Sequence, residues 1–385
     1  MAASAKPKVL YLLHAYFNKG GTEQHTRHLE AGLANSFDIT IAAPHLNEIV
    51  LLKDGTVRQK YQSQMVPWPV TPLNWEVAEE ALQKIVTAVK PDLVHVQHFF
   101  NWPLASIDYL STLGVPSVLS LHDYYLISPY YTLEGAAESA SRSIKACVET
   151  FGCDITLYLQ TRVEYLRECL QQFSKIICPS MFLTEKLRPY FDLDFQVIEH
   201  GIPPFREKVA RPESSKLRFG YVGALLPQKG WQICAEAFKE LKRERPDIEL
   251  HIFGGGHPDE EEKLKSDSAL IFHGAYESKD LPEICSKIDV AVIPSIFAET
   301  YSLVLSEMWE GGVQVAASGI GTLGERIIDK KNGRHFTAGD KDSLKSVLRW
   351  FAENSEWRKW EVERPKALEK MIAEYRALYL DLLSN

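Results

Sequence analysis

Two glutamates, Glu299 and Glu307, lie eight residues apart in the segment P-S-I-F-A-E-T-Y-S-L-V-L-S-E, residues 294–307. The apolar run at 289–293 predicts a strand that turns into a helix, with Glu299 in the turn and Glu307 inside the helix. Amide groups at a helix start can hold a phosphate, and carboxylates accept hydrogen bonds from hydroxyls. The pattern therefore suits an anionic ligand that carries hydroxyls. Taken alone, such a pair is more often explained by the favourable interaction of an acidic residue with the helix dipole. The other segments of the chain therefore determine whether the pair indicates a ligand site.

The same segment resembles the E-x7-E signature of the retaining glycosyltransferases of family 4 (GT4), which have the GT-B fold. Several other segments match this family in the expected order, over most of the chain. The resemblance implies an α/β protein of two Rossmann-like, doubly wound domains that face a central cleft. We expect an acceptor-side domain over residues 1–203 and a nucleotide-sugar donor domain over 204–356. Residues 357–385 should hold a C-terminal helix that crosses back to the first domain.

In the second half, Lys229 belongs to G-Y-V-G-A-L-L-P-Q-K-G-W, after the first strand of that domain. A lysine beside glycines such as Gly223 can neutralise a pyrophosphate as a mobile point charge. The family commonly has an arginine where this chain has Ala224, so Lys229 and the helix amides must carry more of the leaving-group charge. Gly255, in the triplet 254–256, allows close backbone approach to a nucleotide, although a flexible turn explains it equally well.

The resemblance also implies roles for the remaining donor-side residues. Glu299 would hold hydroxyls of the donor sugar and Glu307 the ribose diol. Tyr276 ends the segment H-G-A-Y at 273–276, where relatives hold the base through main-chain groups. The diphosphate would meet the amides of the helix start, which belong to Thr300, Tyr301 and Ser302.

In the first half, Gly20 and Gly21 follow the first strand and match the G-G-x-E loop of the family, near the donor diphosphate and the acceptor. A Gly-Gly pair alone would equally well be a simple turn. His122 closes a strand and aligns with the His-Asp of the family, which implies a hydrogen bond to a donor-sugar hydroxyl. Asp123 would orient His122 or cap the next element. His200 stands where the family has an asparagine, in the segment between the domains.

These residues need strands and helices to position them, and the hydrophobic pattern predicts both in alternation. Nearly continuous apolar strands that alternate with helices indicate parallel sheets covered on both faces, with ligands at the carboxyl ends of the strands. The expected strands are 9–15, 38–43, 92–97, 117–121, 175–178, 196–198, 217–222, 248–253, 269–272, 289–293 and 313–317. The expected helices include 78–89, 231–244, 281–287, 302–310, 340–351 and 365–382.

Length and composition agree with this organisation. A chain of 385 residues exceeds one ordinary core and suits two domains. The net charge of −8, with no broad basic field in either half, argues against nucleic acid as a partner. No apolar run reaches the ~20 residues of a membrane span, and the start is a polar lead into a strand rather than a secretory signal. We therefore expect a cytoplasmic protein.

The six cysteines form no paired C-x-x-C pattern, so we expect them to be reduced and mostly structural. Cys147 lies in a polar insertion between Pro129 and Gly152, and Cys153 directly follows this insertion. Some relatives carry further cysteines in this region, including one where this chain has Ser128. Because serine occupies that ligand position, we do not expect a zinc site.

We therefore predict a retaining glycosyltransferase that moves a hexose from a UDP- or GDP-linked sugar to a glycan, lipid-linked or small-molecule hydroxyl. Its catalytic residues would be His122, Lys229 and Glu299. Preorganised donors can stabilise the departing diphosphate without a metal, so no metal or other cofactor is expected. A lipid-linked acceptor would add peripheral contact with a membrane surface, for which the acidic first half offers no basic patch.

Three alternatives remain open. A nucleotide-sugar 2-epimerase shares the fold and needs no acceptor. A catalytically silent nucleotide-sugar-binding subunit is favoured by one feature, the absent arginine at Ala224. A glycosidase would also use two carboxylates, but the glycines that suit a phosphate argue against it, because glycosidases need no diphosphate site.

Overall fold

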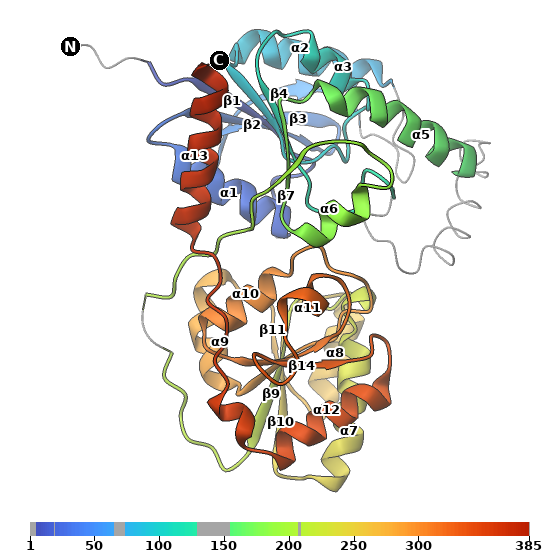
Figure 1. The fold of residues 1–385 in the computed structure, drawn as a ribbon, viewed down its shortest axis with the longest axis vertical. Coiled ribbons are helices and arrows are strands. Elements are labelled where there is room, and N and C mark those ends of the chain that lie inside the picture. The colour runs from blue at the N-terminus through green and yellow to red at the C-terminus, as the bar shows by residue number, and fades with distance from the viewer. Residues whose placement is uncertain (1–4, 19, 65–73, 129–154, 207–208, 385) are drawn as a thin grey trace. The chain divides into compact units, whose positions relative to one another are not determined.

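The computed structural model describes residues 5–18, 20–64, 74–128, 155–206 and 209–384. It divides into two compact units (Figure 1). One comprises Met1–Gly201 together with Leu368–Asn385, and the other comprises Ile202–Ala367. Cys147 and Cys153 lie outside the described residues.

The first unit contains an eight-stranded sheet in the order β4-β3-β2-β1-β5-β6-β7-β8. Six of its strands run parallel. The apolar side chains of β1, β5, β6 and β7 are buried, as is typical of parallel strands with helices on both faces, whereas those of the edge strand β8 are only partly buried. The strands are β1 (Lys8–Leu12), β2 (Asp38–His45), β3 (Glu48–Lys53), β4 (Thr56–Gln62), β5 (Leu93–Val96), β6 (Ser117–Ser120), β7 (Lys175–Cys178) and β8 (Phe195–Val197).

The hairpin of β3 and β4 was missing from the sequence prediction, and it makes this sheet mixed rather than wholly parallel. Its turn is Asp54–Gly55, and both residues have positive φ, 52° and 69°. Asp-Gly is a strong hairpin signal because such a turn needs left-handed residues. Hydrophobic periodicity does not predict this hairpin, because β4, T-V-R-Q-K-Y-Q, is almost entirely exposed and lacks an apolar face.

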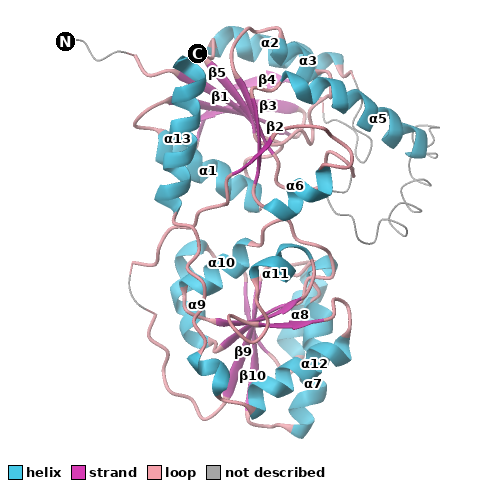
Figure 2. Ribbon diagram, in the orientation of Figure 1, coloured by secondary structure: helices cyan, strands magenta, loops and turns pink. Residues whose placement is uncertain are grey.

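The C-terminal helix α13 (Leu368–Ser384) belongs to the first unit, where it packs beside α1 (Gly21–Leu33) (Figures 1 and 2). A Cβ added at Gly32 of α1 would lie 2.6 Å from Ile372, so the two helices approach closely. The Tyr379 hydroxyl lies 3.0 Å from that of Tyr11 in β1. The other α-helices described in this unit are α2 (Glu76–Val89), α3 (Ser106–Ser111), α5 (Ile155–Cys169) and α6 (Met181–Leu187).

The second unit contains a six-stranded parallel sheet in the order β11-β10-β9-β12-β13-β14. Separate apolar clusters pack on its two faces, one with α7 and α12 and the other with α9, α10 and α11. The strands are β9 (Leu217–Val222), β10 (Ile248–Phe253), β11 (Ile271–Gly274), β12 (Val290–Ile293), β13 (Gln314–Ser318) and β14 (Arg334–Phe336). The α-helices are α7 (Trp231–Glu244), α8 (Pro258–Ser266), α9 (Leu281–Lys287), α10 (Leu303–Glu310), α11 (Gly321–Arg326) and α12 (Lys341–Glu353).

The prediction of two doubly wound α/β domains is confirmed. Strands β7, β9 and β10 and helices α7 and α9 have the predicted bounds. The prediction missed β14, which has only three residues and therefore shows no periodicity. It also extended the first strand to residue 15, whereas β1 ends at Leu12. Within the described part of the chain, no helix has both the length and the apolar content needed to cross a membrane.

Candidate functional site

Lys229 and Glu299 meet at the carboxyl end of the second sheet. Lys229 ends the short 3-10 helix Pro227–Lys229, which follows β9, and Glu299 lies in the loop from β12 to α10. Because β9 and β12 are parallel neighbours, both loops leave the same edge of the sheet. The Lys229 Nζ lies 2.8 Å from the Glu299 Oε1. Glu299 is buried, with 7% of its side chain exposed, whereas Lys229 keeps 32% exposed.

The two loops are fastened to each other through their backbones. Gly230 has φ of 71°, and a Cβ added there would lie 1.9 Å from the Pro294 carbonyl oxygen. The Ile296 N–H donates to the Gln228 carbonyl at 3.0 Å. Only glycine combines this left-handed conformation with so close an approach. The position of Lys229 relative to Glu299 is therefore set by main-chain packing.

The start of α11 holds the backbone of Glu299 from the other side. Thr322 donates from its N–H at 3.0 Å and from its hydroxyl at 3.1 Å to the Glu299 carbonyl. A Cβ added at Gly321, whose φ is 61°, would lie 2.7 Å from the Glu299 nitrogen. Neither residue was identified from the sequence, because a glycine and a threonine at a helix start carry no signal for this contact.

Opposing effects set the ionisation of Glu299. Burial raises its pKa, but the Lys229 ammonium and the hydroxyls of Ser295 and Ser302 lower it further than burial raises it. The net result is a pKa below the usual value, so the carboxylate is ionised at neutral pH. An ammonium has three N–H donors, and Lys229 therefore keeps donors for an anionic ligand while it holds Glu299.

The turn before α10 is fixed by Arg326, which sequence reasoning also missed. Its guanidinium donates to the carbonyls of Tyr301 at 2.7 Å and Ser302 at 3.2 Å, and lies over the Tyr301 ring. Ser302, the residue before the helix, has φ of 66°. Thr300 lies in the same turn. An arginine at the end of a short helix has no pattern that would have revealed this contact.

Glu307 lies inside α10 and is buried. Burial raises its pKa to about 7. Among the residues that the structure describes, no cation forms an ion pair with it. Tyr276, two residues after β11, lies close enough for the Glu307 charge to add to burial in raising the tyrosine pKa. The two residues that were predicted to meet the nucleoside are thus neighbours.

The glycines after β9 and β10 pack the two loops against each other. A Cβ added at Gly254 would lie 1.8 Å from the Gly223 carbonyl oxygen. The Leu225 N–H donates to the Gly255 carbonyl at 2.9 Å. This close packing explains glycine at 254, and the φ of 147° explains glycine at 223, both without a ligand. A contact of Gly223 or Gly255 with the donor therefore stays a prediction. Ala224 follows Gly223, and its carbonyl accepts a hydrogen bond from Tyr221.

In the first unit, Gly20 and Gly21 lead into α1, and neither has positive φ. A Cβ added at Gly20 would lie 2.5 Å from a carboxylate oxygen of Glu23. Glu23 is buried and lies 3.2 Å from the Nε2 of His14, which follows β1. The Glu23 pKa lies below its usual value, because His14 outweighs the effect of burial. Gly20 thus makes room for a buried carboxylate.

His122 follows β6 and lies in a cluster of histidine rings. Its ring stacks on that of His200 with centroids 5.4 Å apart, and His200 shares a 3.0 Å hydrogen bond with His25 of α1. The His122 Nε2 lies 3.4 Å from the Gln97 side-chain oxygen. Burial, together with the neighbouring histidines, lowers the pKa of His122 well below its usual range. His122 is therefore a neutral imidazole at neutral pH.

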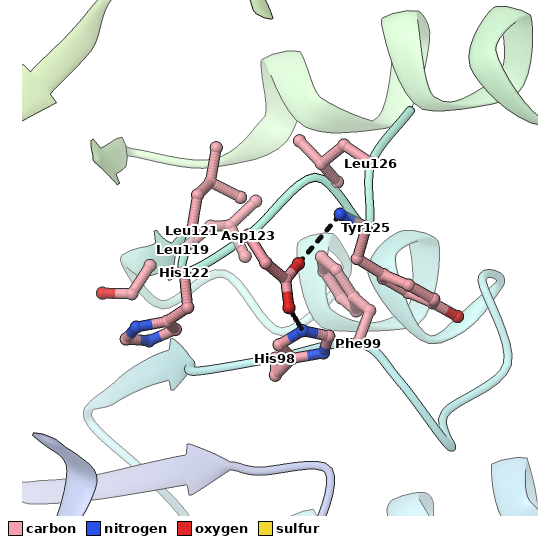
Figure 3. Close-up of a pocket in the computed structure, with 9 residues that line it drawn as sticks. His98, Phe99, Leu119, Leu121, His122, Asp123, Tyr125 and Leu126 are labelled. Carbon is pink, nitrogen blue, oxygen red and sulfur yellow. Dashed lines mark hydrogen bonds and ion pairs between the residues drawn. The ribbon is translucent and has the colours of Figure 1, made fainter. Parts of the chain in front are cut away.

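Asp123 contacts His98 rather than His122 (Figure 3). The Asp123 Oδ2 lies 3.0 Å from the His98 Nε2, and its Oδ1 accepts from the Tyr125 N–H at 2.8 Å. Of the two roles expected for Asp123, the structure supports capping of the next turn. The orientation of His122 comes instead from Gln97 and the other histidines.

No group of three or more His, Cys, Asp or Glu side chains in the described ranges is arranged to hold a metal ion. Two Asp-x-Asp sequences, a pattern used elsewhere for metal-bound diphosphate, occur at 192–194 and 340–342. Asp340 caps α12 through the N–H groups of Asp342 and Ser343. Asp194 lies near Lys175. Metal independence stays a prediction.

Comparisons with known proteins agree with the geometry. A family model for glycosyltransferase family 4 matches residues 19–206, and one for glycosyl transferases group 1 matches residues 203–370. The chain is 30% identical over 163 residues to a glycogen synthase of Mycobacterium tuberculosis. The aligned region covers 40% of this chain and 39% of that protein. It is 27% identical to an uncharacterized glycosyltransferase of Methanocaldococcus jannaschii, over 78% of each chain. The first curated relatives are thus matched over only about two fifths of their length.

Solved structures show the same fold. Sucrose-phosphate synthase from Thermosynechococcus elongatus superposes with a TM-score of 0.72 at 15% identity, over 98% of this chain and all of that one. Anabaena HepE, solved in complex with UDP and glucose, gives 0.65 at 14% identity, over 97% of this chain and 99% of that one. These matches and the two doubly wound units identify the GT-B fold. The chain belongs to the family 4, group 1 glycosyltransferases.

Proposed function

We propose that this protein transfers a hexosyl group from a nucleoside-diphosphate sugar to an acceptor hydroxyl, with retention of the anomeric configuration and without a metal. The contact between Lys229 and Glu299 carries the proposal. At 2.8 Å it joins a partly exposed cation to a buried, ionised carboxylate at the carboxyl edge of a parallel sheet, where ligands of such sheets bind. One group suits a diphosphate and the other suits sugar hydroxyls.

The chemistry follows from the charges that develop. The bond from the anomeric carbon to the β-phosphate oxygen breaks, the bond to the acceptor oxygen forms, and the acceptor proton passes to the departing diphosphate. Negative charge therefore grows on the diphosphate while the sugar becomes oxocarbenium-like. Lys229 and the amides at the start of α10 would stabilise the diphosphate, and preorganised donors of this kind are worth several kcal/mol, about 3–4 for one well-placed donor. Glu299 would hold the sugar hydroxyls, and Glu307 the ribose diol.

His122 would add a hydrogen bond to the donor sugar, because a neutral imidazole can both donate and accept. This role is the one that the family resemblance implies for His122. Gly20, Gly21, Gly223, Gly255 and Tyr276 complete the proposed donor contacts.

The relatives differ in their donors and acceptors. The Anabaena HepE structure contains UDP and glucose, and an Arabidopsis thaliana starch synthase structure contains ADP and acarbose. Curated relatives include two mannosyltransferases, one of them described as GDP-mannose-dependent. We therefore propose a nucleotide hexose as donor and a glycan, lipid-linked or small-molecule hydroxyl as acceptor.

The test is nucleotide release from UDP-, GDP- and ADP-hexoses, measured with and without a panel of glycosides, in the presence and absence of EDTA. Transfer predicts acceptor-dependent release that EDTA leaves unchanged and an α-linked product from an α-linked donor. Acceptor-free isomerisation of the donor would instead show the 2-epimerase, and tight binding without turnover would show a silent binding subunit, which the absent arginine at Ala224 favours. Lys229→Ala should abolish release although the protein, destabilised by about 3–5 kcal/mol, remains folded in the absence of denaturant.

A further inference from the structure

A small pocket in the first unit contains one charged side chain, that of Asp123 (Figure 3). Asp123 follows β6, and 26% of its side chain is exposed. Each carboxylate oxygen accepts one hydrogen bond, from the Tyr125 N–H and from His98. A carboxylate offers about four lone-pair sites, so both oxygens can accept another. The pocket is lined by His98, Phe99, Leu119, Ser120, Leu121, His122, Asp123, Tyr125 and Leu126.

The hydrogen bonds of His98 determine which of its nitrogens carries the proton. The Phe100 N–H donates to the His98 Nδ1 at 2.9 Å, so that nitrogen is unprotonated. The proton therefore lies on Nε2, which donates to Asp123 at 3.0 Å. In this arrangement His98 is a hydrogen-bond donor to Asp123, and it orients the Asp123 carboxylate.

The pocket around the Asp123 carboxylate favours a neutral hydrogen-bond donor as its ligand. The lining of the pocket is mostly apolar, and hydrogen bonds to an ionised group in such surroundings are stronger than in water. The cation Arg162 lies behind the lining, over the Tyr125 ring, and donates to the Leu126 carbonyl. Arg162 is buried and does not line the pocket. A neutral hydroxyl fits this environment better than a phosphate, which the carboxylate would repel.

We propose that Asp123 binds the acceptor, by accepting a hydrogen bond from an uncharged sugar or polyol hydroxyl, with His98 as its positioning residue. The inference rests on the proposed glycosyl transfer and adds the acceptor contact to it. Asp123 adjoins His122, which is expected at the donor sugar, so a hydroxyl held by Asp123 would lie next to the residue that is expected to contact the transferred sugar. Asp123 polarises this hydroxyl and fixes its direction.

The experiment compares three single variants of the full chain with UDP-glucose as donor and octyl glucoside and p-nitrophenyl mannoside as acceptor probes. Asp123→Ser removes the carboxylate while its hydroxyl can still cap the Tyr125 N–H. His98→Gln keeps a side-chain N–H donor. Asp108→Asn is the matched control, because Asp108 accepts from Tyr165 at 2.5 Å and from Gln172 at 3.3 Å in the same unit, away from the pocket.

Loss of one charge-assisted hydrogen bond predicts a fall of roughly 10- to 100-fold in kcat/KM for the acceptor with Asp123→Ser. UDP-glucose binding, measured by calorimetry, and slow hydrolysis without acceptor should change less than about twofold, since neither uses this contact. The kcat/KM of His98→Gln for the acceptor should lie between those of the wild type and Asp123→Ser. The kcat/KM of Asp108→Asn should match that of the wild type.

An Asp123→Ser enzyme that keeps full acceptor-dependent transfer, or that loses donor hydrolysis in proportion to transfer, overturns the inference and leaves the proposed function intact. The same holds if Asp123→Ser does not fold, because a structural role then accounts for the residue. If the wild type releases no nucleotide with any donor or acceptor, the proposed function fails first. The wild-type control thus separates the two failures.

Discussion

Lys229→Met and Glu299→Gln should destabilise the second unit to different extents, although both break the same ion pair. Lys229→Met leaves Glu299 ionised and buried without its counter-charge, and stranding a buried charge costs about 3–5 kcal/mol. Glu299→Gln leaves Lys229, which keeps 32% of its side chain exposed and so remains solvated. That change should cost only about 1 kcal/mol. The expected difference is about 2 kcal/mol or more.

The difference should also depend on pH. In the wild type the Glu299 pKa lies below its usual value, so its contribution to stability is present above the unfolded pKa, near 4.5, and is lost as pH falls through the folded pKa. In Lys229→Met only burial and the serine hydroxyls act, and burial raises the pKa. The variant should therefore lose stability as pH rises above about 4.5, and its deficit should be larger at pH 8 than at pH 5.

Urea unfolding of the two single variants and the double variant, at pH 8 and pH 5, measures these terms. The double variant Lys229→Met/Glu299→Gln should be less destabilised at pH 8 than Lys229→Met alone, since it contains no stranded charge. A Glu299→Gln variant as unstable as Lys229→Met at pH 8, or a deficit of Lys229→Met that does not shrink at pH 5, would refute this account. The Lys229–Glu299 contact would then not be the buried pair described above.

Three further outcomes are expected. Burial raises the Glu307 pKa to about 7, so wild-type stability should fall as pH rises through 7. Glu307→Gln should remove that loss. A melting temperature that differs between Glu307→Gln and the wild type by the same amount at pH 5 and pH 8 would contradict this prediction. Burial lowers the pKa of His25 well below 6.5, so the fold loses stability as pH falls below 6.5. In His25→Gln the midpoint of urea unfolding should change less between pH 7.5 and pH 5.5 than it does in the wild type. An unchanged pH dependence of this midpoint would exclude a role for His25. Gly230→Ala should lower the free energy of unfolding by more than about 2 kcal/mol, because its Cβ would collide with the Pro294 carbonyl. Gly339→Ala is the control, since Gly339 has a similar φ and no atom within 4 Å of the added Cβ, and it should cost about 1 kcal/mol. Equal losses of stability in urea unfolding would contradict the close packing at Gly230.

Much of the fold could be read from the sequence because its signals are local. Strands β9 and β10 and helix α7 have their predicted bounds, since apolar runs and helical periodicity belong to single segments. The β3–β4 hairpin was missed although its Asp54–Gly55 turn is also local. Strand prediction from hydrophobic periodicity depends on apolar residues, which an exposed edge strand such as β4 lacks.

The donor-side residues were identified by the order of short motifs and not by their contacts. Glu299 and Lys229 were singled out separately, because each follows a strand and stands in a recognisable segment. That they form an ion pair could not be predicted, since it depends on β9 lying beside β12 in the sheet. The roles themselves remain proposals, to be tested by the assays above.

The sequence alone determined the two-domain α/β plan, the family and the residues worth testing, because hydrophobic periodicity and motif order are properties of consecutive residues. The tertiary structure decided which residues touch. It joined Asp123 to His98 instead of His122, placed Arg326 and Thr322 behind the Glu299 loop, and brought His200 onto His122. These contacts arise where separate strands end at a common sheet edge, and the packing of the whole unit sets that meeting point.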